Sequence, residues 1–313
     1  RLQVRLRHGR LSLANGEGGG HPSLRISSSD PRGIWLGQRR YRGDLLLLVR
    51  NGRIQAINQL GVETYLPSVV GSEMPAKCPL AALQAQAVAA RTYALRQRGR
   101  KGDFDVKATV SSQVYKGIES ETPRTREAVA TTRSLVLVHG GRLINAVFHS
   151  SSGGSTEPSG EVWQNQLPYL VSVRDHDQHS PVHRWNQRFE ASDLRRRFQE
   201  TGGVERLNVL SKSSTGRVRS ARIQGPLGSL VLTGRQLRQR LGLKSTMVSF
   251  SLLQGARSDA VDPIAPSQSL SESQPQLIGL WSDSASGLSG AEPPVSARRA
   301  LAVAPLPPPP IPQ

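Results

Sequence analysis

The chain has 313 residues, which is long enough for one large domain or two ordinary domains with a packed core. It carries 41 Lys and Arg against 23 Asp and Glu, and aromatic residues make up only 4% of it. Its one cysteine, Cys78, excludes an internal disulfide and a zinc site built from cysteines. No run of 18 apolar residues predicts a membrane span.

The last 59 residues, 255–313, differ in composition from the rest of the chain. They hold 11 of the 21 prolines, are rich in Ser and Gln, and carry a net charge of −2, which leaves +20 on residues 1–254. Such a segment cannot bury enough apolar surface to offset the entropy lost on ordering. We therefore predict a disordered Pro/Ser-rich tail over residues 255–313.

Residues 1–44 predict an N-terminal β segment, in which Leu2, Val4 and Leu6 alternate with polar residues. This start is not a secretory signal, so the protein is either cytoplasmic or has lost a leader before this numbering begins. From residue 44, an apolar run, Asn51-Gly52 and a second run predict a hairpin with a type I′ turn.

Two helices are predicted next, with an acid between them. Residues 62–72 predict a short helix, and Pro75 pushes Met74 out of helical geometry, so Glu73 falls where this helix ends. Pro79 suits the first turn of a second, Ala-rich helix that runs to about Arg98. One face of it carries apolar and small residues: Leu80, Leu83, Ala87, Ala90 and Ala94.

Short strands and helices are predicted after residue 98. A second hairpin spans 134–148 with Gly140-Gly141 at its turn, a polar run follows over 149–156, and a third β pair covers 207–210 and 218–223. Short helices fit 191–198 and 234–241, with Ser192 and Thr233 as their N-caps. The fold class is therefore α+β, with hairpin-rich β-sheets packed around one dominant Ala-rich helix.

Three features indicate where chemistry could occur, and each has a simpler explanation. Glu73 lies between two apolar helices, where loss of hydration raises the pKa of a carboxyl and suits it to general acid catalysis; a surface Glu at a helix end is the simpler reading. The Ser/Gly run over 149–156 could line a polar cleft, or be an ordinary loop. Trp163, Pro168 and Tyr169 offer flat faces on which sugars stack, or pack in a core.

One long stretch resembles a known family. Residues 61–94, which contain Ser72-Glu73-Met74-Pro75 and most of the Ala-rich helix, closely resemble the signature of the SpoIID/LytB family of sporulation and cell-wall proteins. Shorter segments agree in the same order, at 112–117, 146–156, 161–163, 167–170 and 243–246. This resemblance defines a predicted SpoIID-like catalytic domain over residues 45–254.

The resemblance implies a lytic transglycosylase that cleaves peptidoglycan glycan strands, notably strands stripped of peptides. The family's catalytic acid matches Glu73, and one carboxylate suffices because the 6-hydroxyl of the sugar is the nucleophile and a 1,6-anhydro product forms. The matched segments also predict a polar groove around Glu73 that binds sugar hydroxyls, formed by Gln113, Tyr115, His149, Ser150, Ser152 and Thr156. Glu63 is the other acid of the signature, and we predict that it pairs with a basic residue such as Arg91.

The sequence departs from the family in two places. Relatives commonly continue after the equivalent of Ser245-Thr246 with a Gly-His-Gly-x-Gly-x-Ser-Gln block, which this chain does not have. Where some relatives have Cys and His near the Ser/Gly run, this chain keeps only His149, so we predict no structural metal, and no cofactor.

Two alternatives to the enzyme stay open. The first is a glycan-binding or amidase-enhancing module, with a cell-wall amidase as partner, which the missing block favours. The second is a polyanion or nucleic-acid binder, as the net charge allows. The basic residues are scattered and have no aromatic ladder between them, so no specific nucleic acid is expected. For either wall function the predicted location is extracytoplasmic, with an export signal that is not present in this chain.

Overall fold

The computed structural model describes residues 2–13, 20–99, 102–251 and 295–297. The chain divides into two compact units, one of Arg1–Phe148 with Leu277–Gln313 and the other of His149–Gln276. This division falls inside the predicted catalytic domain, whose boundaries at residues 44 and 254 stay a prediction. The mixture of helices with several small antiparallel sheets confirms the predicted α+β class.

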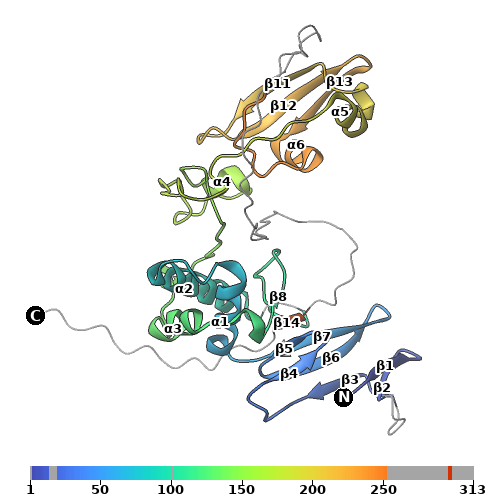
Figure 1. The fold of residues 1–313 in the computed structure, drawn as a ribbon, viewed down its shortest axis with the longest axis vertical. Helices are drawn as coiled ribbons and strands as arrows, with labels where there is room; N and C mark the ends of the chain where they lie inside the picture. Colours follow the sequence, from blue (N-terminus) through green and yellow to red (C-terminus); the bar gives the residue numbers. More distant parts are fainter. Residues whose placement is uncertain (1, 14–19, 100–101, 252–294, 298–313) are drawn as a thin grey trace, which may run out of the picture. The chain divides into compact units, whose positions relative to one another are not determined.

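The first unit begins with β-strands (Figure 1). A five-stranded sheet has the order β3-β6-β7-β14-β8, and two separate hairpins pair β1 with β2 and β4 with β5. The strands are β1 (Val4–Arg7), β2 (Arg10–Leu13), β3 (Ser23–Ile26), β4 (Ile34–Leu36), β5 (Arg39–Tyr41), β6 (Asp44–Arg50), β7 (Arg53–Gln59), β8 (Val106–Lys107) and β14 (Val295–Ala297).

The hairpin of β6 and β7 confirms the first predicted turn. Asn51 and Gly52 have φ angles of 50° and 69°, the left-handed pair that a type I′ turn requires. This turn sets the register Arg50↔Arg53, and with it Leu45 of β6 and Ile57 of β7 are buried. The sheet thereby gains the apolar face on which the unit is built.

Three helices complete the first unit and lie side by side in Figure 1: α1 (Val62–Glu73), α2 (Leu80–Gln97) and α3 (Pro123–Thr131). The predicted face of α2 is confirmed: Leu83, Ala87, Ala90 and Ala94 are buried, and Leu80 is partly buried against the same core. The small side chains of the three alanines let α1 and α3 approach closely, and the helices share one apolar core with Tyr65 and Tyr115. The backbone of Ser120, in the 3₁₀ helix η1 (Ile118–Ser120), comes so close to Gly71 that a Cβ there would lie 1.9 Å from its carbonyl oxygen.

A buried ion pair joins α1 to α2. The Arg91 side chain is only 1% exposed, and its Nε and Nη2 each donate to a different carboxylate oxygen of Glu63 at 2.8 Å. Arg91 also donates to the carbonyls of Val129 and Leu135, so its guanidinium is hydrogen-bonded to Glu63 and to these two carbonyls. The predicted pairing of Glu63 with Arg91 is confirmed.

The second predicted hairpin, over 134–148, is much shorter than expected. Its strands are only β9 (Val138–His139) and β10 (Arg142–Leu143), although Gly140 and Gly141 do form the turn, with φ angles of 54° and 71°. Leu135, Leu137 and Val138 are exposed, whereas Ala146 is buried, and the alternation does not extend into a longer ladder.

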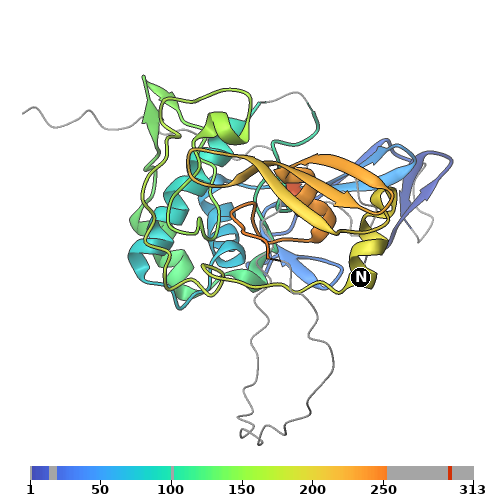
Figure 2. The ribbon, with the colours of Figure 1, turned by 90° about the horizontal axis from the view of Figure 1, so that it is seen from above.

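The second unit is a three-stranded antiparallel sheet with helices on it, and Figure 2 shows α6 against the strands. Its elements are α4 (Ser159–Val162), α5 (Ala191–Arg197), the 3₁₀ helix η2 (Gln199–Thr201), β11 (Arg206–Lys212), β12 (Val218–Gly225), β13 (Gly228–Thr233) and α6 (Gly234–Leu241). Its core includes Phe198, Ile223, Leu237 and Leu241. This unit has a hydrophobic core of its own.

The two predicted N-caps in this unit have different outcomes. Thr233 caps α6: its hydroxyl accepts from the Gln236 N–H at 3.2 Å, and the Gln236 side chain accepts from the Thr233 N–H at 2.9 Å. Ser192 was the wrong cap for α5, because that helix begins one residue earlier and its N-cap is Glu190. Helical geometry at Ala191 moves Ser192 into the first turn, where it cannot cap.

The predicted disordered tail, 255–313, lies outside the described residues except for Val295–Ala297, which form β14 between β7 and β8. Across the described ranges, none of the helices combines the length and apolarity needed to cross a membrane.

Candidate active site

Glu73 is the last residue of α1, and the sequence explains why the helix ends there. Pro75 disfavours helical geometry at the residue before it, and Met74 is extended, with φ −133° and ψ 141°. The Met74 N–H still donates to the Val70 carbonyl and closes the last turn. The Glu73 carboxyl is thus placed at the carbonyl end of a helix, whose negative partial charge opposes ionisation.

The surroundings of Glu73 favour its protonated form. Burial raises the pKa of the Glu73 carboxyl to about 7, against the opposing effects of the Val114 N–H and the Lys116 charge. The Val114 N–H donates to Oε1 at 2.7 Å, and among the described residues nothing donates to Oε2. The rise in pKa that the sequence predicted is confirmed, and its first cause is loss of hydration.

Val114 belongs to an extended segment, residues 113–117, that alternates between buried and partly exposed side chains. Gln113 and Tyr115 point inward and anchor it. The Gln113 side chain accepts from the Tyr65 hydroxyl at 3.2 Å and donates to the Ala90 carbonyl at 3.1 Å. The Tyr115 hydroxyl donates to Asn58 at 2.6 Å, and its ring lies 4.9 Å from that of Tyr65. These contacts fix the backbone that holds Glu73.

Gln113 and Tyr115 were predicted to bind sugar, and both side chains lie in the interior. Their polar atoms bond to other groups of the protein, so in this structure they support Glu73 by holding residue 114. Direct contact with a glycan stays a prediction for both.

The other predicted binding residues belong to the second unit. His149 and Ser150 are exposed, whereas Ser152 is buried and its hydroxyl donates to Asp175 at 2.7 Å. The Thr156 hydroxyl accepts from the Val173 N–H at 2.9 Å. The predicted groove therefore draws Glu73, Gln113 and Tyr115 from the first unit and these four residues from the second, and their meeting in one groove stays a prediction.

Two residues that the sequence reasoning missed hold the Ser/Gly run in shape. Asp177 binds the Ser151 hydroxyl, the Gly153 N–H at 2.8 Å and His183 Nδ1 at 2.8 Å, and these hydrogen bonds lower its pKa despite burial. Arg217 donates to the carbonyls of Ser152 and Ser155 at 2.6 and 2.9 Å and pairs with Glu157 at 3.0 Å.

These missed residues lie far from the run in sequence. Asp177 is more than twenty residues and Arg217 more than sixty residues beyond the Ser/Gly run, so no local pattern pointed to either. Val114 escaped notice for another reason, since it acts through its backbone.

In the part of the chain that the structure describes, no three His, Cys, Asp or Glu side chains gather closely enough to hold a metal ion. Cys78 is a free, partly buried thiol.

Comparison with known proteins places Glu73 in a matched segment. Residues 50–139 match the family described as SpoIID, stage II sporulation protein. The stage II sporulation protein D of Bacillus subtilis is 32% identical over 212 residues, covering 61% of this chain and 60% of that protein. The amidase enhancer of the same organism is 44% identical over 110 residues, or 35% of this chain and 15% of that protein.

A third relative, an uncharacterized protein of Brachyspira hyodysenteriae, is 33% identical over 165 residues, covering 52% of this chain and 45% of that protein. The chain thus spans less than two thirds of the length of each of these relatives. The predicted resemblance to the SpoIID/LytB family is confirmed, and residues 50–139, which include Glu73, are the part of the chain that matches the family.

Proposed function

We propose that this chain acts on the glycan strands of bacterial peptidoglycan as a lytic transglycosylase, with Glu73 as its single general acid and base. The observation that carries the proposal is a carboxyl held at the end of α1 with a pKa of about 7, inside the family-matched segment. Near neutral pH such a group is protonated in a large fraction of molecules, which general acid catalysis requires.

The hydrogen bonding of Glu73 assigns its two oxygens different tasks. Oε1 accepts from the Val114 N–H, so Oε2 is the oxygen that carries the proton. Oε2 protonates the glycosidic oxygen as the bond to the anomeric carbon breaks. The carboxylate then takes the proton of the sugar's 6-hydroxyl as that oxygen bonds to the anomeric carbon and closes the 1,6-anhydro ring. The group returns to its protonated form, and no second carboxylate is needed.

The names of the relatives support a wall function. Stage II sporulation protein D and the amidase enhancer are the proteins that this chain resembles. From them we infer an extracytoplasmic location and peptide-free glycan strands as the substrate. The +20 charge on residues 1–254 suits a surface of anionic wall polymers.

One observation favours a second function. The highest identity among the three relatives described above, 44%, is to the amidase enhancer, and the block that commonly follows Ser245-Thr246 in the family is missing here. A module that binds glycan and enhances a cell-wall amidase, without cleaving glycan itself, is therefore the alternative. It would use the same surface and would not need the Glu73 proton.

Mass spectrometry of products from purified, peptide-free glycan strands tests the proposal. The wild-type chain should release products with 1,6-anhydro ends, and Glu73→Gln should lower the rate by about 10²–10⁴, because an amide cannot deliver the proton. Glu127→Gln is the matched control, since Glu127 is an exposed acid on α3 and its loss removes the same charge. This control should cleave at the wild-type rate.

The outcomes separate the two functions. A wild-type chain that binds glycan and stimulates an amidase, yet yields no anhydro product, would support the enhancer. A Glu73→Gln chain that cleaves as fast as the wild type would show that another group is the acid.

A further inference from the structure

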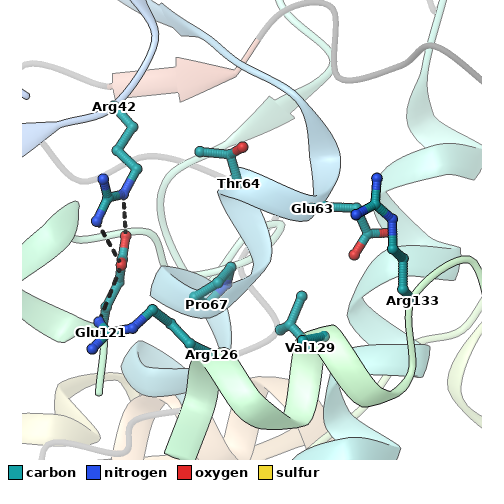
Figure 3. A pocket seen from close by; sticks show the side chains of 9 residues that line it. Arg42, Glu63, Thr64, Pro67, Glu121, Arg126, Val129 and Arg133 are labelled. Atoms are coloured by element: carbon teal, nitrogen blue, oxygen red, sulfur yellow. Dashed lines mark hydrogen bonds and ion pairs between the residues drawn. The ribbon is translucent and has the colours of Figure 1, made fainter. Parts of the chain in front are cut away.

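A pocket of about 390 Å³ lies between α1 and α3, and nothing in the proposed chemistry uses it. Figure 3 shows its walls: Glu63, Thr64 and Pro67 come from α1, while Arg126 and Val129 come from α3. Arg42, Glu121, Ala130 and Arg133 complete the lining. We call it the arginine pocket. Its volume is within the range of sites for small ligands.

The arginine pocket lies on the far side of α1 from Glu73. Successive helical residues turn by about 100°, so Thr64 projects about 180° away from Glu73, nine residues later, and Pro67 about 120° away. Two of the three α1 residues that line the pocket thus project to the side of the helix away from Glu73.

The two acids of the pocket are already committed to other arginines. The Glu121 side chain is 3% exposed and accepts from Nε and Nη2 of Arg42, both at 3.2 Å, with Arg126 at 3.5 Å (Figure 3). Glu63 is held by Arg91 behind the pocket wall. The lining itself has three guanidinium groups and two carboxylates; with Arg91, which is buried and not part of the lining, the surplus is two positive charges.

Arg133 carries part of this surplus. Within the described ranges its guanidinium has no hydrogen bond or ion pair, and the residue is exposed just beyond the end of α3. A guanidinium presents a planar pair of N–H donors that matches the two oxygens of one carboxylate. Pro67, Val129 and Ala130 lie in the same lining; Ala130 is exposed, whereas Pro67 and Val129 are buried and present only a small apolar area to a ligand.

We propose that the arginine pocket binds a short peptide through its free carboxylate, which pairs with Arg133, while small aliphatic side chains rest on Pro67, Val129 and Ala130. The Thr64 hydroxyl and the Glu63 carboxylate, whose side chain is 28% exposed, can accept hydrogen bonds from the N–H groups of the peptide. A phosphate has no aliphatic group to contact Pro67, Val129 or Ala130, so it would use only the charged part of the lining. The proposal does not depend on the function of Glu73.

The test measures binding of N-acetyl-alanyl-alanine to the full chain at low salt by ligand-observed NMR. The free acid should bind, and the C-terminal amide should bind at least about tenfold more weakly, because it loses the charge-assisted pair. Arg133→Gln should remove the difference between acid and amide. Arg133→Lys should keep only part of this difference, since lysine has the charge but not the planar pair of N–H donors.

Arg53→Gln is the matched control, because Arg53 is an exposed arginine of the same unit at the start of β7 and is not part of the lining. It should leave the preference for the acid unchanged. The proposal is overturned if acid and amide bind equally to the wild type, if neither binds, or if Arg133→Gln keeps the preference. Inorganic phosphate that competes as well as the peptide acid would overturn the assignment to a peptide. The assay contains no glycan, so its result is independent of transglycosylase activity.

Discussion

Two acids of the same helix, Glu63 and Glu73, differ in what surrounds them. Glu63 at the start of α1 pairs with the guanidinium of Arg91, whereas Glu73 at the end accepts one backbone N–H, is largely removed from water and has only the charge of Lys116 nearby to oppose the rise of its pKa. Environment alone therefore separates a paired structural carboxylate from one whose protonated form is favoured, as the proposed acid requires. This difference could be predicted from the sequence, because Arg91, the partner of Glu63, and Pro75, which ends α1 just after Glu73, both lie in the stretch that matches the family.

The raised pKa of Glu73 makes stability depend on pH. A carboxyl whose pKa rises on folding binds its proton more tightly in the native chain, so stability falls as pH increases from the ordinary value of 4.5 to about 7. Glu73→Gln should then be more stable than the wild type by on the order of 2 kcal/mol at about pH 8, and equal to it at about pH 4. Urea unfolding at both pH values measures this. A constant difference between the two chains would contradict the assignment.

Breaking the pair of Glu63 and Arg91 should act through stability. Glu63→Gln leaves the buried Arg91 charge without its counterion, and we expect a loss of about 3 kcal/mol in the free energy of unfolding. Glu190→Gln removes an acid from an exposed pair with Arg188 and should leave the melting temperature unchanged. Equal melting temperatures for Glu63→Gln and the wild type would mean that the pair contributes nothing to the fold.

At the scale of elements, strong local signals predicted the structure well. The Asn51-Gly52 turn, the end of α1 and the Ala-rich α2 each follow from a residue whose backbone preference or side-chain size decides the geometry locally. The helix α3 was missed because its residues are mostly polar, so it has little apolar periodicity. Its start was nonetheless readable, since Thr122 and Pro123 form a cap and first turn.

The predictions that failed mostly concerned residues whose partners are distant in sequence. The segment 134–148 has strand-like composition but no neighbouring strand beyond its own turn, so it pairs over two residues only. The strand β13 is an exception, since it was missed although its partner is local: it pairs with β12 through a tight turn at Gly225–Gly228. The predicted site had the same limit, because Asp177 and Arg217 reach the Ser/Gly run only through the fold.

The caps of α5 and α6 give a test at this scale. Thr233→Ala should lower the free energy of unfolding by about 1 kcal/mol, because it removes the hydroxyl that caps α6. Ser192→Ala should have little effect, since Ser192 lies inside α5 and does not cap it. Denaturant unfolding of both variants compares them directly, and a larger loss for Ser192→Ala would contradict the cap assignment.

The close approach of α1 to η1 provides a second test at the scale of elements. Alanine normally favours a helix over glycine by about 1 kcal/mol, yet Gly71→Ala should destabilise the chain, because its Cβ would lie 1.9 Å from the Ser120 carbonyl oxygen. Gly61→Ala is the control, because the nearest atom to a Cβ there is Thr64 Oγ1, at an ordinary contact distance of 4.0 Å, and φ is an ordinary −69°. The melting temperature should fall for Gly71→Ala and stay unchanged for Gly61→Ala. A stabilised Gly71→Ala chain would show that η1 can move aside.

For the whole molecule, the net charge of +18 governs association more than fold. Binding to purified wall material should weaken as salt is raised, because exposed charges are screened over about 10 Å at moderate ionic strength. Wall binding should nevertheless exceed DNA binding at physiological salt, since no base-reading motif was found. Sedimentation with wall fragments or DNA over a salt series measures both. Equal affinities with equal salt dependence would favour the polyanion alternative.

The bond from Val114 to Glu73 has a consequence for how this site tolerates change. The donor is a main-chain N–H, so it survives whatever side chain stands at residue 114, and proline alone abolishes it. The neighbours Gln113 and Tyr115 hold that backbone through buried side chains. In a saturation scan, position 114 should thus be permissive to every residue except proline, between two intolerant positions, and a screen of side chains would overlook the group that orients the acid.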